Sequence, residues 1–319
     1  MLHKLLFILL LLSAFGSVLM PSSIKKTSWP KAIQKTSKYS SAEGFQLGRA
    51  LFYDPILSKD SSISCASCHL SYTAFAHVDH ATSHGVEDRI GKRNAPGLFN
   101  LAWRSNFNWD GGVLNLSGQA INPLTHPDEM GETLTNVLDK LNANANYKQY
   151  FKRVYKQPTI QTWMLLDAIQ QFTIALVSKN SFFDRVQKNE VEFTTQQASG
   201  YRLFENYCQR CHEAPLFFSN RFESNGIASS NDLGRFEITG KPTDKNLFRV
   251  PSLRNITHTF PYMHDGRFKT LKAVLQHYSK QFNLDENAQK DIIAFLKTLT
   301  DTSFIFNPEF QFHTLKSQP

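Results

Sequence analysis

Four cysteines and two histidines form two copies of one short pattern. The pattern comprises Cys65, Cys68 and His69 in the first copy and Cys208, Cys211 and His212 in the second. Two thiols three positions apart can reach the two vinyl groups of one porphyrin, while the adjacent imidazole binds its iron. This spacing is that of c-type haem attachment. We therefore predict two covalent haem c groups per chain, with the two histidines as iron ligands.

Two other interpretations of the cysteines are weaker. Four cysteines in an exported protein could form two disulfides, but all four lie inside the repeated pattern. A zinc site needs four ligands and usually pairs two such half-sites. Because both copies end in histidine, haem accounts for the pattern better than disulfides or zinc do.

The N-terminus has the layout of an export signal. Lys4 precedes an apolar run that reaches Leu19, as in the n-region and h-region of a secretory leader. No small-x-small triplet closes the run before Pro21, so residues 1–22 are predicted to be a signal peptide or an N-terminal membrane anchor. We expect the protein to be periplasmic or otherwise exported, in the kind of compartment where covalent haem is attached.

Length and charge set further limits. A chain of 319 residues is long enough for two domains of ordinary size. Its formal net charge of +8 favours acidic partners through electrostatic steering. Because Lys and Arg are spread along the chain without a dense cluster or an aromatic-basic motif, we expect no nucleic-acid partner.

Helical patterns surround both attachment sites. Apolar residues recur at helical spacing over 44–53 and 196–208, each just before a cysteine pair, and again over 287–299. A more uniformly apolar segment, 164–177, is expected to lie buried between the two halves. Long strand patterns are missing from the sequence, so we predict a mainly α fold.

The repeated pattern also predicts the domain organisation. A polar run over 187–197 suggests a boundary between two modules. We predict two tandem cytochrome c-like domains with long loops, over residues 40–185 and 190–305, each binding one covalent haem.

Further strings outside the haem motifs carry a family resemblance. They are GKRNAP at 91–96, NWDGG at 108–112, DEMG at 128–131, FRVPSLRN at 248–255 and PYMHDGRF at 261–268. In this order they resemble the bacterial dihaem cytochrome c peroxidases and their relatives of the MauG type. The likeness extends from about Leu47 to Leu299. It implies an enzyme that reduces hydrogen peroxide or uses it to oxidise a partner.

The resemblance assigns catalytic roles to three residues. Gln119 and Glu129 match the amide and the carboxylate over the N-terminal, peroxide-binding haem, and Trp109 matches the tryptophan between the haems. A sheltered carboxylate can move protons between the two peroxide oxygens, and an indole between two redox centres is oxidisable. Without the resemblance, Glu129 would be an ordinary solvated acid and Trp109 a core aromatic.

A structural calcium ion is a further implication of the resemblance. Asn94, Thr259 and Pro261 match positions that hold calcium between the domains. Asn94 would bind through its side-chain oxygen and the other two through backbone oxygens.

The sequence departs from the peroxidases at the ligand of the C-terminal haem. Those peroxidases tend to use methionine, whereas the segment after Gly266 offers His277 and Tyr278. MauG-type members use tyrosine, so we predict Tyr278, with His277 as the alternative and Met263 as a weaker one. A phenolate ligand stabilises ferric iron and should lower the potential of that haem.

A second departure concerns the N-terminal haem. Peroxidases that need reductive activation carry a distal histidine at a position that falls here on Val86, which cannot bind iron. His77, His80 and His84 are close enough in sequence to substitute for it. Two alternatives stay open: one of these histidines binds, or the haem is five-coordinate at rest.

Three functions follow from these predictions. The first is a peroxidase that takes electrons from a small redox protein, a cytochrome c or a cupredoxin. The second is a MauG-like, peroxide-dependent oxidation of a partner protein, toward which Tyr278 points. The third is a dihaem electron carrier, which would have no use for Glu129. Assembly as a homodimer stays open.

Overall fold

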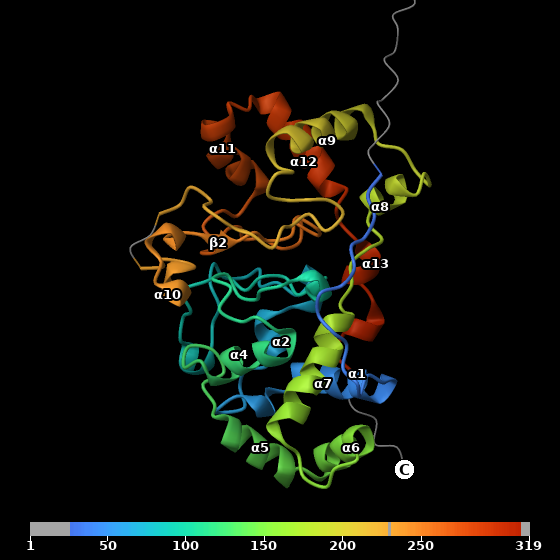
Figure 1. Ribbon diagram of the computed structural model, residues 1–319, viewed down its shortest axis with the longest axis vertical. Coiled ribbons are helices and arrows are strands. Elements are labelled where there is room, and N and C mark those ends of the chain that lie inside the picture. The colour runs from blue at the N-terminus through green and yellow to red at the C-terminus, as the bar shows by residue number, and fades with distance from the viewer. Residues whose placement is uncertain (1–25, 229–230, 314–319) are drawn as a thin grey trace, which may run out of the picture.

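Most of the described chain is helical and loop, with very little sheet (Figure 1). The computed structural model describes residues 26–228 and 231–313, so the predicted leader over 1–22 lies outside the described residues. Two short strands, β1 (Phe222–Glu223) and β2 (Phe248–Arg249), pair antiparallel. The predicted mainly α class is confirmed. Within the described residues, no helix is both long and apolar enough to cross a bilayer.

The helices follow one another along the chain in two groups, before and after α8. They are α1 (Ala42–Tyr53), α2 (Cys65–Cys68), α3 (Leu116–Gln119), α4 (Ile121–Thr125), α5 (Leu134–Ala143), α6 (Ala145–Tyr155), α7 (Thr162–Ala175), α8 (Phe182–Gln187), α9 (Thr195–Tyr207), α10 (Phe236–Thr239), α11 (Leu271–Phe282), α12 (Glu286–Lys297) and α13 (Thr302–Ile305). The predicted helices over 44–53, 196–208 and 287–299 correspond to α1, α9 and α12.

Side-chain caps fix where the long helices begin. The hydroxyl of Ser41 accepts a hydrogen bond from the third residue of α1, and Thr194 and Asp285 do the same for α9 and α12. Such caps satisfy backbone N–H groups that have no partner inside the helix. They therefore define the start of each helix that leads to, or packs beside, a cysteine pair.

Two helix crossings repeat the same design. α1 crosses α7, and α9 crosses α12. A Cβ atom on Gly48 would lie 1.9 Å from the backbone oxygen of Ala168, and one on Gly200 would lie 1.9 Å from that of Asp291. Only glycine permits so close an approach of two helix backbones. Each half of the molecule thus contains one such pair next to one cysteine pair.

Separate apolar cores form around the two crossings. The first is built around Leu51 and Leu165, in the lower half of Figure 1, and the second around Phe204 and Phe295, in the upper half. The expectation that 164–177 lies between the halves was wrong. α7 packs along α1 inside the first core, because α1 covers much of its apolar surface. The domain limits 40–185 and 190–305 stay a prediction.

Both ends of the described chain cross from one half to the other. Phe304 of α13 packs 6.1 Å from Phe75, ring centroid to ring centroid, in a cluster that belongs to the first half. The N-terminal segment runs the other way, where the Lys26 Nζ donates to the Asn189 side-chain oxygen at 2.5 Å. These two crossings tie the halves together at places far from the cysteines.

A buried ion pair connects α8 to the second half. Arg254 is fully buried, and its two terminal nitrogens donate to the Asp184 carboxylate at 2.7 Å each. The backbone N–H and the hydroxyl of Ser181 also donate to Asp184, both at 2.8 Å. Every oxygen of this carboxylate is therefore engaged.

We expect Asp184→Asn to lower the free energy of unfolding by about 3 kcal/mol or more, because it leaves the Arg254 charge buried and unpaired. Denaturant unfolding of the variant measures the loss. The control is Glu190→Gln, which breaks the exposed pair with Arg185 and should cost less than about 1 kcal/mol. Equal losses in the two variants would contradict the importance of the buried pair.

Candidate haem sites and peroxide pocket

The first cysteine pair lies on the single turn of α2. His69 follows this turn, and its Nδ1 donates to the Phe75 carbonyl oxygen at 2.8 Å. The hydrogen bond fixes the tautomer and leaves Nε2 available for a metal. Burial lowers the pKa of His69 to about 4, so the ring is neutral at pH 7. The geometry suits an axial ligand of a haem held by Cys65 and Cys68.

The second cysteine pair has the same arrangement. His212 Nδ1 lies 3.1 Å from the Pro251 carbonyl oxygen and 3.3 Å from that of Phe217. Burial lowers the pKa of His212 to about 4 as well. None of the four cysteines, all in the described part of the chain, forms a disulfide, so both pairs are available for haem attachment.

The predicted proton-transfer carboxylate lies beside the first cysteine pair. Glu129 follows α4, and its charge contributes to raising the pKa of the Cys65 and Cys68 thiols, which burial raises most. Burial also raises the pKa of Glu129 itself, an effect that His126 opposes and Asp128 reinforces. A carboxyl group whose pKa is raised in this way is a stronger proton acceptor than an ordinary one, as a group that accepts and returns a proton needs to be.

Gln119 and Trp109 are connected through Asn108. The Gln119 amide donates to the Asn108 side-chain oxygen at 3.3 Å. Trp109 is buried, and its indole N–H donates to the Asn94 carbonyl oxygen at 2.8 Å. Its ring lies 6.5 Å from that of His264, edge to face. The indole thus sits where the two halves meet, and its role between two haems stays a prediction.

The predicted calcium ligands are close to one another. Asn94 Nδ2 donates to the Pro261 carbonyl oxygen at 2.5 Å, and Thr259 is two residues away in sequence. The Asn94 side-chain oxygen is buried with no hydrogen-bond partner in the structure. A buried amide oxygen without a partner and a nearby backbone carbonyl oxygen are the kinds of ligand that calcium takes, so Asn94 and Pro261 fit the ion, and the calcium site stays a prediction.

Among residues 26–228 and 231–313 there is no group of three or more His, Cys, Asp or Glu placed to hold a metal ion. The predicted calcium set is compatible with that finding because it consists of an amide and backbone oxygens. The three histidines at 77, 80 and 84 likewise do not form a metal cluster.

His277 and Tyr278 are neighbours on α11, and their side chains lie in different surroundings. Burial, with smaller contributions from the Cys211 and Cys208 thiols, raises the pKa of Tyr278 to about 12, so the phenol is near the second cysteine pair. His277 Nε2 instead lies 2.8 Å from the Asn225 carbonyl oxygen. Tyr278 therefore lies on the side of the second cysteine pair and His277 on the side of Asn225, and the choice of Tyr278 as the ligand stays a prediction. Met263 places its sulfur 3.9 Å from the Asn225 amide nitrogen.

The loop that could carry a distal histidine places an apolar residue beside Glu129. Val86 is buried, and its backbone N–H donates to the Glu129 carbonyl oxygen at 2.8 Å. His84 stacks on His80 with ring centroids 4.0 Å apart, and His77 lies 5.3 Å from His80. The histidines thus contact one another, and His77 Nδ1 is buried with no hydrogen-bond partner in the structure. Whether one of these histidines binds the N-terminal haem or the haem is five-coordinate at rest stays a prediction.

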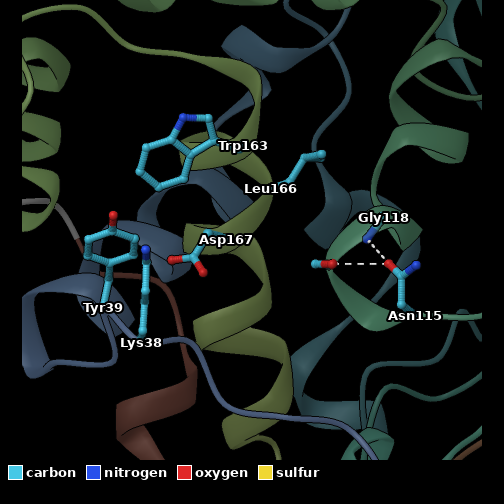
Figure 2. Close-up of a pocket in the computed structure, with 8 residues that line it drawn as sticks. Lys38, Tyr39, Asn115, Gly118, Trp163, Leu166 and Asp167 are labelled. Carbon is cyan, nitrogen blue, oxygen red and sulfur yellow. Dashed lines mark hydrogen bonds between the residues drawn. The ribbon is translucent and has the colours of Figure 1, made fainter.

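A surface cleft of about 320 Å³ lies away from these residues. Figure 2 shows that Tyr39 and Trp163 border it on one side and Asn115 and Gly118 of α3 on the other. None of the predicted site residues lines it. The cleft is therefore not the peroxide pocket, although Gln119 is the next residue of α3.

Two buried arginines were missed by the sequence analysis. Arg104 and Arg249 lie between the halves, each close to a predicted site residue. Arg249 belongs to the string FRVPSLRN, which could have marked it, whereas no motif marks Arg104.

Comparisons with known proteins agree with this geometry. Residues 42–192 match the family described as di-haem cytochrome c peroxidase. The chain is 32% identical to cytochrome c551 peroxidase of Nitrosomonas europaea over 100% of this chain and 99% of that protein. It is 34% identical to the methylamine utilization protein MauG of Methylorubrum extorquens over 81% of this chain and 78% of that one.

A solved structure is similar along nearly the whole chain. It is the crystal structure of a MauG-like protein associated with microbial copper homeostasis, with a TM-score of 0.79 and 30% identity. The match covers 93% of this chain and 99% of that one. Because its named relatives are cytochrome c peroxidases, the protein is a haem-dependent oxidoreductase. The chain belongs to the family of dihaem cytochrome c peroxidases and MauG proteins, as predicted.

Proposed function

We propose that the protein is an exported dihaem c-type peroxidase that reduces hydrogen peroxide with electrons from a cytochrome c or a cupredoxin. The observation that carries the proposal is the half-buried Glu129 carboxylate near the cysteine pair whose histidine is set to bind iron. A bound haem supplies the iron that binds peroxide and exchanges electrons.

The residues around the first haem would direct protons. Cys65 and Cys68 would hold the porphyrin, and His69 Nε2 would bind its iron. Glu129 would take a proton from the near peroxide oxygen and return one to the leaving oxygen, while the Gln119 amide would orient the peroxide by a hydrogen bond. Two electrons and two protons per peroxide give two water molecules.

The residues around the second haem would handle electrons. Cys208 and Cys211 would hold that haem, with His212 and Tyr278 as its iron ligands. Trp109 would serve as an oxidisable relay between the halves. A calcium ion bound by Asn94, Thr259 and Pro261 would fix the contact between the halves rather than take part in the reaction.

The position of Tyr278 favours a second candidate function. A tyrosine ligand is what the MauG type uses, and the chain is similar to MauG itself. In that function the electrons would come from side chains of a partner protein instead of a small redox protein. A dihaem carrier without peroxide chemistry is disfavoured, because it would not need a half-buried acid at Glu129.

Two measurements test the proposal: the haem content of the protein and its oxidation of a reduced donor protein. Purified exported protein should contain two haems by alkaline pyridine haemochrome and should oxidise reduced cytochrome c or cupredoxin when peroxide is added. A content near one haem, with zinc present, would contradict it. Two haems and a fast peroxide reaction without oxidation of either donor would favour the MauG-like function.

We expect the double variant Cys208→Ser, Cys211→Ser to lower the haem content from two to one per chain. The remaining haem should still bind peroxide, because its attachment site lies in the other half. The reciprocal variant Cys65→Ser, Cys68→Ser should also keep one haem but lose the peroxide reaction. Peroxide binding that survives in the reciprocal variant would mean that the two roles are reversed.

A further inference from the structure

Two arginines are buried where the halves meet and lack a carboxylate partner. Arg104 follows the turn 101–103 and is 4% exposed, and Arg249 ends β2 and is 7% exposed. Neither guanidinium makes an ion pair in the part of the chain that the structure describes. A buried, unpaired charge is costly.

Two other arginines, one buried and one half-buried, are neutralised by carboxylates. Arg254 binds Asp184 at 2.7 Å, and Arg93 binds Asp232 at 2.7 Å. The signature of an arginine that the protein neutralises internally is therefore a carboxylate oxygen 2.7 Å from the guanidinium. Arg104 and Arg249 lack that signature, which indicates that their counter-charge comes from outside the polypeptide.

The contacts of each guanidinium use only some of its hydrogen-bond donors. Arg104 donates to the Val250 carbonyl oxygen at 2.8 Å and lies 3.5 Å over the Phe218 ring. The Arg249 Nε donates to the Asn108 carbonyl oxygen at 2.9 Å. A guanidinium has five N–H donors, so donors are left over on both side chains.

The two charges also act on each other. Burial lowers the pKa of Arg104, and the positive charge of Arg249 lowers it further. Burial likewise lowers the pKa of Arg249 to about 10, against the weaker effect of Asp110. Two like charges in one buried region favour a shared anion.

The positions of these arginines point to the haem sites. Val250, which Arg104 binds, is followed by Pro251, whose carbonyl oxygen faces the His212 ring. Arg249 binds the carbonyl group of Asn108, whose side chain holds Gln119. The pair therefore extends from the proximal side of the second haem site toward the peroxide pocket.

We propose that Arg104 and Arg249 form a carboxylate-binding site between the halves, and that its ligand is the propionate groups of bound haem. Thioether attachment consumes the vinyl groups of haem c and leaves its carboxylates free. A carboxylate tethered nearby has a high effective concentration, and arginine binds carboxylates through two parallel hydrogen bonds. The inference rests on haem attachment at Cys208 and Cys211, proposed above.

One consequence is that the first half of the chain controls the second haem. Arg104 comes from the first half yet binds the Val250 carbonyl oxygen, one residue before the carbonyl group of Pro251 that faces His212. A positive charge that neutralises a propionate removes a negative charge beside the iron, which makes the ferrous state easier to reach. Arg104 is thus a positioning residue that helps to set the potential of the C-terminal haem.

Redox titration tests the proposal without reference to activity. Arg104→Gln should shift the midpoint potential of the C-terminal haem to a lower value, because an uncompensated propionate stabilises ferric iron. Arg104→Lys keeps the positive charge, so its midpoint potential should lie close to that of the wild type. Haem content by pyridine haemochrome accompanies each titration; loss of haem in the Gln variant that Lys recovers would also support the site.

Arg235→Gln is the matched control. Arg235 also lies at the junction of the halves, 3.8 Å over the Phe222 ring and donating to the Asp110 carbonyl oxygen, but it has a carboxylate partner in Asp244. It should leave the potential unchanged. An unchanged potential in Arg104→Gln, an equal shift in both variants, or no rescue by lysine would overturn the proposal.

A small exchangeable anion such as chloride is the alternative ligand for the two arginines. Replacing chloride by a larger anion at constant ionic strength should leave the wild-type potential unchanged if propionates occupy the site. A chloride-dependent potential would overturn the propionate assignment. Fewer than two haems in the wild-type protein would contradict the proposed function, whereas two haems with an insensitive potential would contradict only the arginine site.

Discussion

Glu129→Gln is expected to slow the reaction with hydrogen peroxide by roughly two to four orders of magnitude, the usual worth of a positioned acid-base group. The amide keeps the shape of the side chain but cannot accept a proton from peroxide. Both haem spectra and the unfolding transition should stay as in the wild type. Stopped-flow mixing of the resting protein with peroxide measures the rate, and an unchanged rate would remove Glu129 from the reaction.

The pH dependence gives a second signature of the same group. Only the carboxylate form of Glu129 accepts a proton, so the rate should rise as the pH increases through its pKa. Burial raises this pKa above the ordinary 4.5, and the midpoint of the rise should therefore lie above pH 4.5. Glu129→Gln should lose this rise and stay slow at every pH.

Asp128→Asn is the control, because it removes a negative charge next to Glu129 but keeps the Glu129 carboxyl group. The Asp128 charge contributes to raising the pKa of Glu129. Its removal should therefore move the midpoint of the rate profile to lower pH while leaving the plateau within a few-fold of the wild type. A plateau as low as that of Glu129→Gln would mean that the whole segment, and not one carboxylate, determines the rate.

The positions of the helices could be predicted from the sequence, but the helices that they pack against could not. Apolar spacing identifies α1, α9 and α12 because it depends on residues a few positions apart. Burial of α7 was expected for the same reason, yet its apolar faces do not specify what covers them. The crossing at Gly48 depends on the backbone of Ala168, more than a hundred residues later. Such a contact leaves no local pattern.

The same limit applies to the site. The cysteine pairs and their histidines follow a local pattern, since one porphyrin must be reached from adjacent positions. Arg104 and Arg249 stand out because no described carboxylate lies within ion-pair distance of either guanidinium, which is a property of the fold. Neighbouring residues on a helix point about 100° apart, so the sequence could not decide between His277 and Tyr278.

Tyr278→Met is expected to raise the midpoint potential of the C-terminal haem by on the order of a few tenths of a volt, within the roughly 0.8 V range that axial ligands cover. A phenolate favours ferric iron, whereas a neutral sulfur donor favours ferrous iron. The optical and electron paramagnetic resonance spectra should change to those of histidine and methionine ligation. Peroxide should still react in the other half, where His69 and Glu129 are unaltered.

His277→Ala separates ligation from a general disturbance of α11. It removes the hydrogen bond to the Asn225 carbonyl oxygen but leaves the phenol beside Cys208 and Cys211, so the resting spectra should stay unchanged. If His277→Ala changes the spectra and Tyr278→Met does not, His277 is the ligand. The MauG-like function would then lose its main support, since it is the phenolate that distinguishes that type from a peroxidase with a neutral ligand.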